Sequence, residues 1–166
     1  LDNQANVNRE TKEGATAVHF AAADGSLERM GMLINAGAKV SVMSNSGTPL
    51  HWAAGKGSTA AIKYFVGKGA EIETTEIKSR SRNGNVVTPA VIMAAVGSSD
   101  DSVCALLEAG AYGGHVITGN LTLLHICAEN RLSEAVTKLI GTEEGRKCAH
   151  IRSSYNNTPI ELAAMH

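Results

Sequence analysis

The chain has no strong charge of either sign and no apolar run long enough to cross a membrane. Its 166 residues carry a formal net charge of −1, so the overall charge favours neither nucleic acid nor an acidic membrane surface as a partner. A spanning helix needs about 18 or more consecutive apolar residues, and no stretch approaches that length. We therefore expect a soluble protein without membrane insertion, in the cytoplasm or alternatively the nucleus.

Aromatic residues and cysteines are also scarce. Aromatic content is 4%, which suits thin helix pairs packed through alanine and leucine better than a thick core. The three cysteines, an odd number without Cys-x-x-Cys spacing, are Cys104, Cys127 and Cys148. This pattern predicts reduced thiols in an intracellular protein and no disulfide framework.

What the chain does contain is a recurring four-residue signature, Thr48-Pro49-Leu50-His51. Degenerate copies begin at Thr16, Thr88, Thr122 and Thr158, so that successive copies are 32, 40, 34 and 36 residues apart. A Gly-Ala pair follows each of the first three copies, at 37–38, 69–70 and 110–111. Self-similarity at this period is typical of solenoids built from stacked units.

Each element of the signature has a structural explanation. Proline at the first helical position has no amide to leave unpaired, and the preceding threonine caps the helix and bonds the histidine three residues later. One unit of about 33 residues costs about 50 kcal/mol to order and buries too little apolar surface alone. We therefore expect the units to stack into one elongated domain.

These co-occurring motifs resemble the ankyrin-repeat family over nearly the whole chain. The resemblance implies an all-α solenoid of about four helix-turn-helix repeats, with a partial repeat at each end and hairpin-like loops between repeats. The expected divisions of the single domain 1–166 are the end of a preceding repeat (1–10), repeats at 11–42, 43–75, 87–113 and 120–152, an extended hairpin insertion (76–86) and the start of a further repeat (157–166). Both ends fall inside a repeat, which predicts a segment of a longer chain.

Local departures from the period give further expectations. In repeat one we expect helices at 16–23 and 27–35. Repeat three loses the histidine and gains a residue, which we place near Ser98-Ser99. In repeat four, residues 141–147 replace the usual closing turn.

The resemblance implies a protein–protein interaction module, an adaptor or scaffold that holds a protein partner across its concave face and hairpin tips. Two short segments, 48–58 and 124–128, are also similar to plant and protist proteins in which ankyrin repeats precede tetratricopeptide repeats. A regulatory segment of a larger enzyme or channel is the alternative, and a structural spacer is a third possibility. We expect a monomer.

In this family, contacts come from the turn before the first helix and from that helix's exposed positions. Carried over to this chain, these positions are Lys12, Glu13, Ala15, Ala23, Asp24, Asn45, Ser46, Trp52, Gly55, Lys56, Asn85, Val96, Asn120, Glu129 and Asn130. Trp52 stands out because tryptophan is enriched among residues that dominate binding energy. Packing of Trp52 against the next repeat is an equal alternative.

A basic segment lies in the expected insertion. Lys78, Arg80 and Arg82 alternate with polar residues ahead of Asn83-Gly84, a pair favoured in tight hairpin turns. Alternation could place the three cations on one side of a finger that contacts an acidic partner. A plain solvated loop is the other interpretation.

The sequence offers little for catalysis or metal binding. His19, His51 and His125 occupy the signature position one repeat apart, about 10 Å by stacked-helix spacing, whereas the ligands of one zinc ion all lie about 2 Å from it. Lys56 lacks the glycine spacing of a phosphate loop, and Asp100-Asp101 is expected to be an acidic pair in a surface turn. We predict no enzyme activity and no catalytic, metal or cofactor-binding residues.

Overall fold

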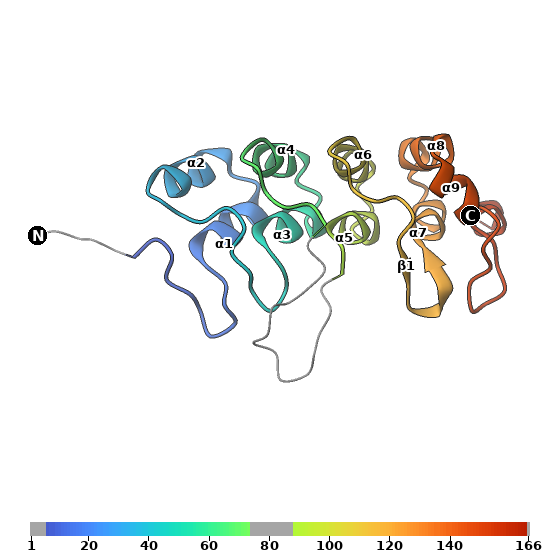
Figure 1. The fold of residues 1–166 in the computed structure, drawn as a ribbon, viewed down its shortest axis with the longest axis horizontal. Helices are drawn as coiled ribbons and strands as arrows, with labels where there is room; N and C mark the ends of the chain where they lie inside the picture. Colours follow the sequence, from blue (N-terminus) through green and yellow to red (C-terminus); the bar gives the residue numbers. More distant parts are fainter. Residues whose placement is uncertain (1–5, 74–87, 166) are drawn as a thin grey trace, which may run out of the picture.

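The computed structural model describes residues 6–73 and 88–165, which form a row of antiparallel helix pairs (Figure 1). The pairs are α1 (Ala17–Asp24) with α2 (Leu27–Asn35), α3 (Pro49–Gly55) with α4 (Thr59–Gly67), α5 (Ala90–Val96) with α6 (Asp100–Glu108), and α7 (Leu123–Glu129) with α8 (Ser133–Gly141). Two further helices are α9 (Glu143–Cys148) and α10 (Pro159–Ala164). The expected all-α solenoid is confirmed, while the exact divisions between repeats stay a prediction.

Local sequence explains where these helices begin and end. Threonine N-caps α1, α3, α7 and α10 in extended conformation, each with a capping box to the residue three positions on. Gly37, Gly69 and Gly110 follow the second helices with φ of 88°, 78° and 97°, a left-handed turn that glycine adopts without steric cost. The helices expected at 16–23 and 27–35 correspond to α1 and α2 within one residue.

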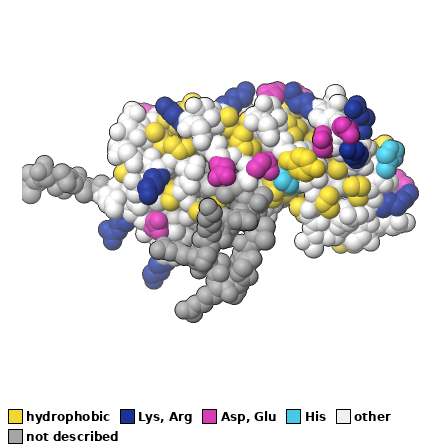
Figure 2. All heavy atoms as spheres, viewed as in Figure 1, with side chains coloured by type: hydrophobic (Ala, Val, Ile, Leu, Met, Phe, Trp, Pro, Cys, Tyr) yellow, Lys and Arg dark blue, Asp and Glu magenta, His cyan; other side chains and the backbone are white. Residues whose placement is uncertain are grey.

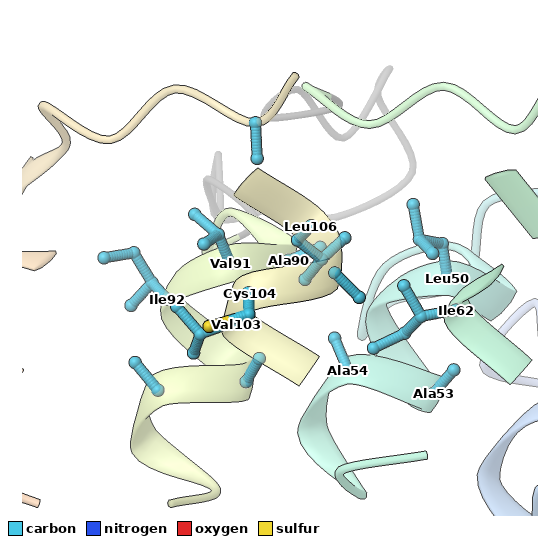
Figure 3. Packing of buried hydrophobic residues seen from close by; sticks show 14 of the residues in the cluster. Leu50, Ala53, Ala54, Ile62, Ala90, Val91, Ile92, Val103, Cys104 and Leu106 are labelled. Carbon is cyan, nitrogen blue, oxygen red and sulfur yellow. The ribbon is translucent and has the colours of Figure 1, made fainter. Parts of the chain in front are cut away.

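The core is continuous along the row rather than gathered at one centre. Leu50, Ile62 and Phe65 are fully buried in the second pair, and Figure 3 shows such side chains meeting those of the next pair. The first helices also pack on one another from α1 to α3, α5, α7 and α10. Ala53-Ala54 and Ala94-Ala95 are completely buried, so small side chains allow this close approach.

The third pair is offset by one residue from its sequence signature. α3 begins at its proline, whereas α5 begins at Ala90, and Pro89 is its N-cap with φ −50° and ψ 143°. Ile92, which is 1% exposed, therefore occupies the position three after the N-cap that His51 holds in α3. The extra residue precedes α5, so its expected place near Ser98-Ser99 was wrong.

Ser98 has a different role in that turn. Its φ is 55°, and it occupies the left-handed position directly before the N-cap of the second helix. Gly25 and Gly57 hold the same place in the first two pairs, with φ of 71° and 67°. The turn between the helices is therefore conserved in shape although its residue changes.

Loops join successive pairs and project from one side of the helix row (Figure 1). Between α6 and α7 the loop is a short antiparallel hairpin of β1 (Val116–Ile117) and β2 (Leu121–Thr122), with the 3-10 turn η1 (Thr118–Asn120) between them. The first helices and these loops meet at an angle, and we call the surface inside that angle the concave face. The insertion expected at 76–86, including Asn83-Gly84, lies outside the described residues.

The segment that replaces the closing turn of repeat four is itself helical. Thr142 N-caps α9 by accepting a hydrogen bond from the Gly145 amide at 3.0 Å. Acidic residues occupy the first turn of α9 and basic residues the last, which complements the helix dipole. Within residues 6–73 and 88–165, none of the helices has the length and apolar character needed to traverse a bilayer.

Candidate partner-binding surface

Each helix pair with its loop forms one layer of the stack, and two of the signature histidines, His19 and His125, connect one layer to the next. His19 Nδ1 accepts the Thr16 backbone N–H at 3.0 Å, so the ring proton lies on Nε2, which donates to the Gly47 carbonyl of the next layer at 3.2 Å. His125 repeats this arrangement with Thr122 at 3.1 Å and Asn157 at 3.1 Å. Burial lowers the pKa of His19, which favours this neutral form. His19 and His125 therefore each add a hydrogen bond between neighbouring layers.

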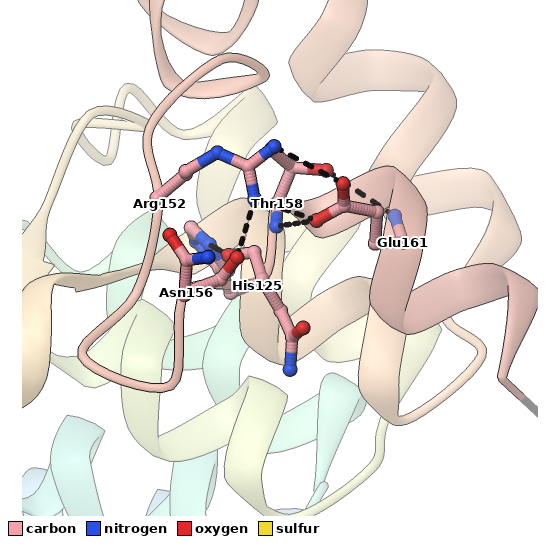
Figure 4. Close-up of polar contacts among 6 residues, drawn as sticks. His125, Arg152, Asn156, Thr158 and Glu161 are labelled. Carbon is pink, nitrogen blue, oxygen red and sulfur yellow. Dashed lines mark hydrogen bonds and ion pairs between the residues drawn. The ribbon is translucent and has the colours of Figure 1, made fainter.

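The fifth layer begins with α10, where Glu161 takes the position that histidine has in the signature (Figure 4). Glu161 accepts the Thr158 backbone N–H at 2.7 Å and pairs with both terminal nitrogens of Arg152 at 3.2 Å. Arg152 also donates to the carbonyl of Asn156. The Thr158 amide, followed by Arg152, holds the pKa of Glu161 below its usual value, so the link stays ionised at neutral pH.

Five candidate contact residues meet in one hollow on the concave face. Ala23, Ser46, Trp52, Gly55 and Lys56 line it together with Met93. These residues come from α1, α3, α5 and the turn before α3, so three layers contribute. Its volume is about 260 Å³. We call it the Trp52 hollow.

Trp52 is half-buried and leans on the preceding layer. Its ring meets Phe20 and His19 edge-on, with centroids 5.4 and 5.3 Å apart. The indole N–H donates to Ser44 Oγ at 3.3 Å. The aromatic packing of Trp52 is therefore toward the preceding repeat, while Met93 of the next repeat lines the same hollow. With its N–H engaged, Trp52 offers a partner apolar ring surface.

Several other candidates serve contacts within the stack. Asn130 donates its side-chain amide to the Ala95 carbonyl at 3.0 Å, across a layer boundary. Asp24 pairs with Arg29 at 2.6 Å, with both side chains about half exposed. The Glu13 carbonyl accepts the Asn45 backbone N–H at 2.8 Å. These residues reach the surface but do not line the Trp52 hollow.

The remaining candidates are distributed more widely. Lys12 and Glu129 are exposed and outside the hollow. Lys78, Arg80, Arg82 and Asn85 lie outside the described residues, so their contribution stays a prediction.

Sequence reasoning missed Met93 as a surface residue. It follows Ile92 as Trp52 follows His51, so the one-residue offset of α5 concealed its equivalence. The available signal was Pro89, which can stand at the N-cap as well as at the first helical position. Met93 supplies the third layer's share of the Trp52 hollow.

Asp100 was also misjudged as part of an acidic pair in a surface turn. Its carboxylate accepts the Glu134 backbone N–H at 3.0 Å and the Ala135 N–H at 2.7 Å. These amides belong to the first turn of α8, where helices have unpaired donors. Asp100 therefore caps α8, a helix of the next layer. No local sequence motif predicts this long-range contact.

The potential metal ligands of the described residues are scattered rather than clustered. Among them, no three His, Cys, Asp or Glu side chains lie in an arrangement that could hold a metal ion. Burial raises the pKa of Cys104 to about 11 and of Cys127 to about 12. Their thiols are therefore overwhelmingly protonated at neutral pH and poor nucleophiles.

A family model described as ankyrin repeats (3 copies) matches residues 1–76. The matched range contains the helix pairs α1–α2 and α3–α4, and the pairs α5–α6 and α7–α8 continue the same order of elements beyond it.

Proposed function

Because the chain belongs to the ankyrin-repeat family, we propose that it is an adaptor or scaffold holding a protein partner across its concave face. Ankyrin repeats are generally protein–protein interaction modules. The observation that carries the proposal is the Trp52 hollow, where three layers bring an aromatic ring, a thioether and a lysine to one surface point. A stable interaction would bury about 800 Å² on each partner, which requires contacts well beyond this hollow.

The hollow suits one side chain of a partner better than a whole cofactor. At about 260 Å³ it lies below the range of about 300–1,000 Å³ that is usual for small-molecule sites. Trp52 and Met93 provide apolar walls, and Ala23 and Gly55 leave the space open because their side chains are minimal. An aliphatic or aromatic residue of the partner is the proposed occupant.

Charge at the rim adds a second requirement. Lys56 is exposed beside the hollow, whereas the nearby carboxylate of Asp24 is already paired with Arg29. The rim therefore favours a partner segment with an acidic residue next to its apolar one. We further propose that the protein acts as a monomer in the cytoplasm, where its buried thiols would remain reduced.

The test compares two charge reversals in the same repeat. Lys56→Glu changes the rim of the hollow, and Lys63→Glu makes the same change on the exposed side of α4, away from it. Proteins retained from lysate by the unaltered chain would be quantified by mass spectrometry and measured again with each variant. We expect Lys56→Glu to lower retention of the specific partners severalfold and Lys63→Glu to leave it unchanged. Equal retention by the two variants would refute the choice of surface.

A further inference from the structure

A second hollow lies beside α9, the helix that replaces the closing turn of repeat four. Its volume is about 430 Å³. Loop residues after α6 form one side, and the end of α8 with the start of α9 forms the other. Among the described layers, a helix directly follows the second helix of a pair only here. We call it the α9 hollow.

The α9 hollow and the Trp52 hollow are lined by different elements. The Trp52 hollow is lined by the first helices α1, α3 and α5 and the turn before α3, whereas the α9 hollow is lined by the ends of the second helices α6 and α8, the loop after α6 and the start of α9. The two hollows have no lining residue in common. A ligand in one hollow therefore has contacts separate from those of a ligand in the other.

The floor of the α9 hollow is apolar and open. Leu107 and Ala111 line it, and Gly110 has no heavy atom within 4 Å of the place a side chain would take. Gly113 lies so close to the buried Leu139 that an added Cβ would be 2.8 Å from its Cδ2. The glycines thus let the loop pass close to α8 and leave room above it.

Tyr112 is held in place at the edge of this hollow. Its backbone N–H donates to Glu73 Oε1 at 2.8 Å, and its ring meets that of His115 edge-on with centroids 5.2 Å apart. Glu73 also bonds His115 Nε2 at 3.0 Å. Although 50% exposed, the ring is positioned before any ligand arrives.

The charged groups at the rim leave a carboxylate in excess. Glu108 pairs with Lys138 at 2.7 Å, whereas Glu144 takes part in none of the ion pairs among residues 6–73 and 88–165. On the face drawn in Figure 2, charges of both signs are interspersed and form no large patch of one sign. The negative excess at this rim is the carboxylate of Glu144.

We propose that the α9 hollow is a second docking site, which takes an arginine of a peptide segment together with a neighbouring apolar side chain. The apolar floor would cover the aliphatic residue and the guanidinium would pair with Glu144 beside the Tyr112 ring. Arginine fits better than lysine because its planar group both stacks on aromatic faces and forks onto a carboxylate. This site is independent of the Trp52 hollow.

The probe is the capped dipeptide acetyl-Leu-Arg-amide, added to the ¹⁵N-labelled chain and followed by backbone amide shifts. Its matched control is acetyl-Leu-citrulline-amide, which has nearly the same shape and no charge. We expect the arginine peptide to shift the amides of Tyr112, Gly113 and Glu144, with about fivefold higher affinity than the citrulline peptide. The amides of Trp52 and Lys56 should not move.

Variants of two adjacent glutamates test whether the arginine of the peptide pairs with Glu144. Glu144→Gln should reduce the affinity for the arginine peptide to that of the citrulline peptide. Glu143→Gln alters the neighbouring residue, which is paired with Lys147 at 2.7 Å and does not line the hollow, and should leave the affinity unchanged. Added salt should weaken the binding of the arginine peptide and leave the binding of the citrulline peptide unchanged.

Each of three results near the α9 hollow would overturn the proposal. They are no shift near Tyr112 at about 5 mM arginine peptide, equal affinity for the two peptides, and equal effects of the two variants. Shifts confined to Trp52 and Lys56 would also overturn it and would leave the proposed function of the concave face standing.

Discussion

The first and last layers of this stack solve the same bonding problem with different chemistry. At the α1–α3 boundary a neutral histidine joins the layers and an aromatic cluster of Phe20, His19 and Trp52 covers it. At the α7–α10 end, Glu161 with Arg152 occupies the equivalent position of the final layer. In both cases the buried or partly buried amide of the N-cap threonine receives an acceptor. The lesson is that the stack requires a satisfied donor, not a particular residue.

In the third layer the N-cap residue needs no side-chain acceptor for a backbone N–H. Its N-cap is Pro89, which has no backbone N–H to satisfy. The buried Ile92 can therefore replace histidine at this position without leaving a donor unpaired. Residue choice at the two positions is coupled by this single hydrogen bond.

Placing histidine in the third layer should have the largest effect. In Ile92→His the imidazole would enter a site that is 1% exposed and find no N–H at Pro89, while apolar burial is lost. We expect the free energy of unfolding to fall by about 4 kcal/mol, measured by urea denaturation. The apolar control Ile92→Val, which removes one methylene, should cost about 1 kcal/mol; a similarly small cost for histidine would show that the coupling is wrong.

The reciprocal change should be milder. His19→Ile leaves the buried Thr16 N–H without its acceptor, whereas Gly47 O still accepts from Ser44 Oγ at 2.7 Å. We expect a loss of about 2 kcal/mol, again from denaturation. If the variant is as stable as the unaltered chain, the histidine link is not needed at this boundary.

Alanine variants of Asp100 and Asp101, two neighbouring residues of the third layer, should differ less in stability. Asp100→Ala removes the cap from the first turn of α8 and should cost about 1 kcal/mol. Asp101→Ala, at an exposed position one residue on, should change stability by less than about 0.5 kcal/mol. Thermal melting of both variants checks this, and equal shifts would contradict the cap.

The smallest effect concerns pH. Burial lowers the pKa of His19 below its ordinary value of 6.5, so the unfolded chain binds more protons than the folded chain in the window beneath that value. Stability from this group is fully present above pH 6.5 and is lost as pH falls through the folded pKa. Unfolding measured between about pH 7 and pH 5 should show a steeper decline in the unaltered chain than in His19→Ile. Identical slopes would mean that His19 does not contribute.

Much of this architecture could be predicted from the sequence because its repeated residues act locally. Threonine, proline and glycine determine helix starts and turns within a few residues, which is why α1 and α2 were placed within one residue. α5 was misregistered because Pro89 is compatible with two cap positions. The start of α9 was signalled by Thr142 ahead of two glutamates, but Gly145 and the lack of apolar periodicity obscured the helix.

The surface was less predictable than the fold. Ser46, Trp52 and Lys56 were identified by their positions in the repeat, but their meeting with Met93 depends on packing between layers that are about 40 residues apart. The cap from Asp100 to α8 and the α9 hollow arise in the same way, from contacts between layers. Sequence periodicity describes one layer at a time and contains no direct record of such contacts.

Site-specific photo-crosslinking tests the docking account most directly. A benzoylphenylalanine in place of Ser46 would sit at the Trp52 hollow, and the same group in place of Lys63 would sit on the exposed side of α4. After irradiation in cells, the account predicts a discrete protein adduct from position 46 that disappears when Lys56→Glu is added, and no such adduct from position 63. Adducts of equal yield from both positions, or an adduct at 46 that is indifferent to Lys56→Glu, would contradict it.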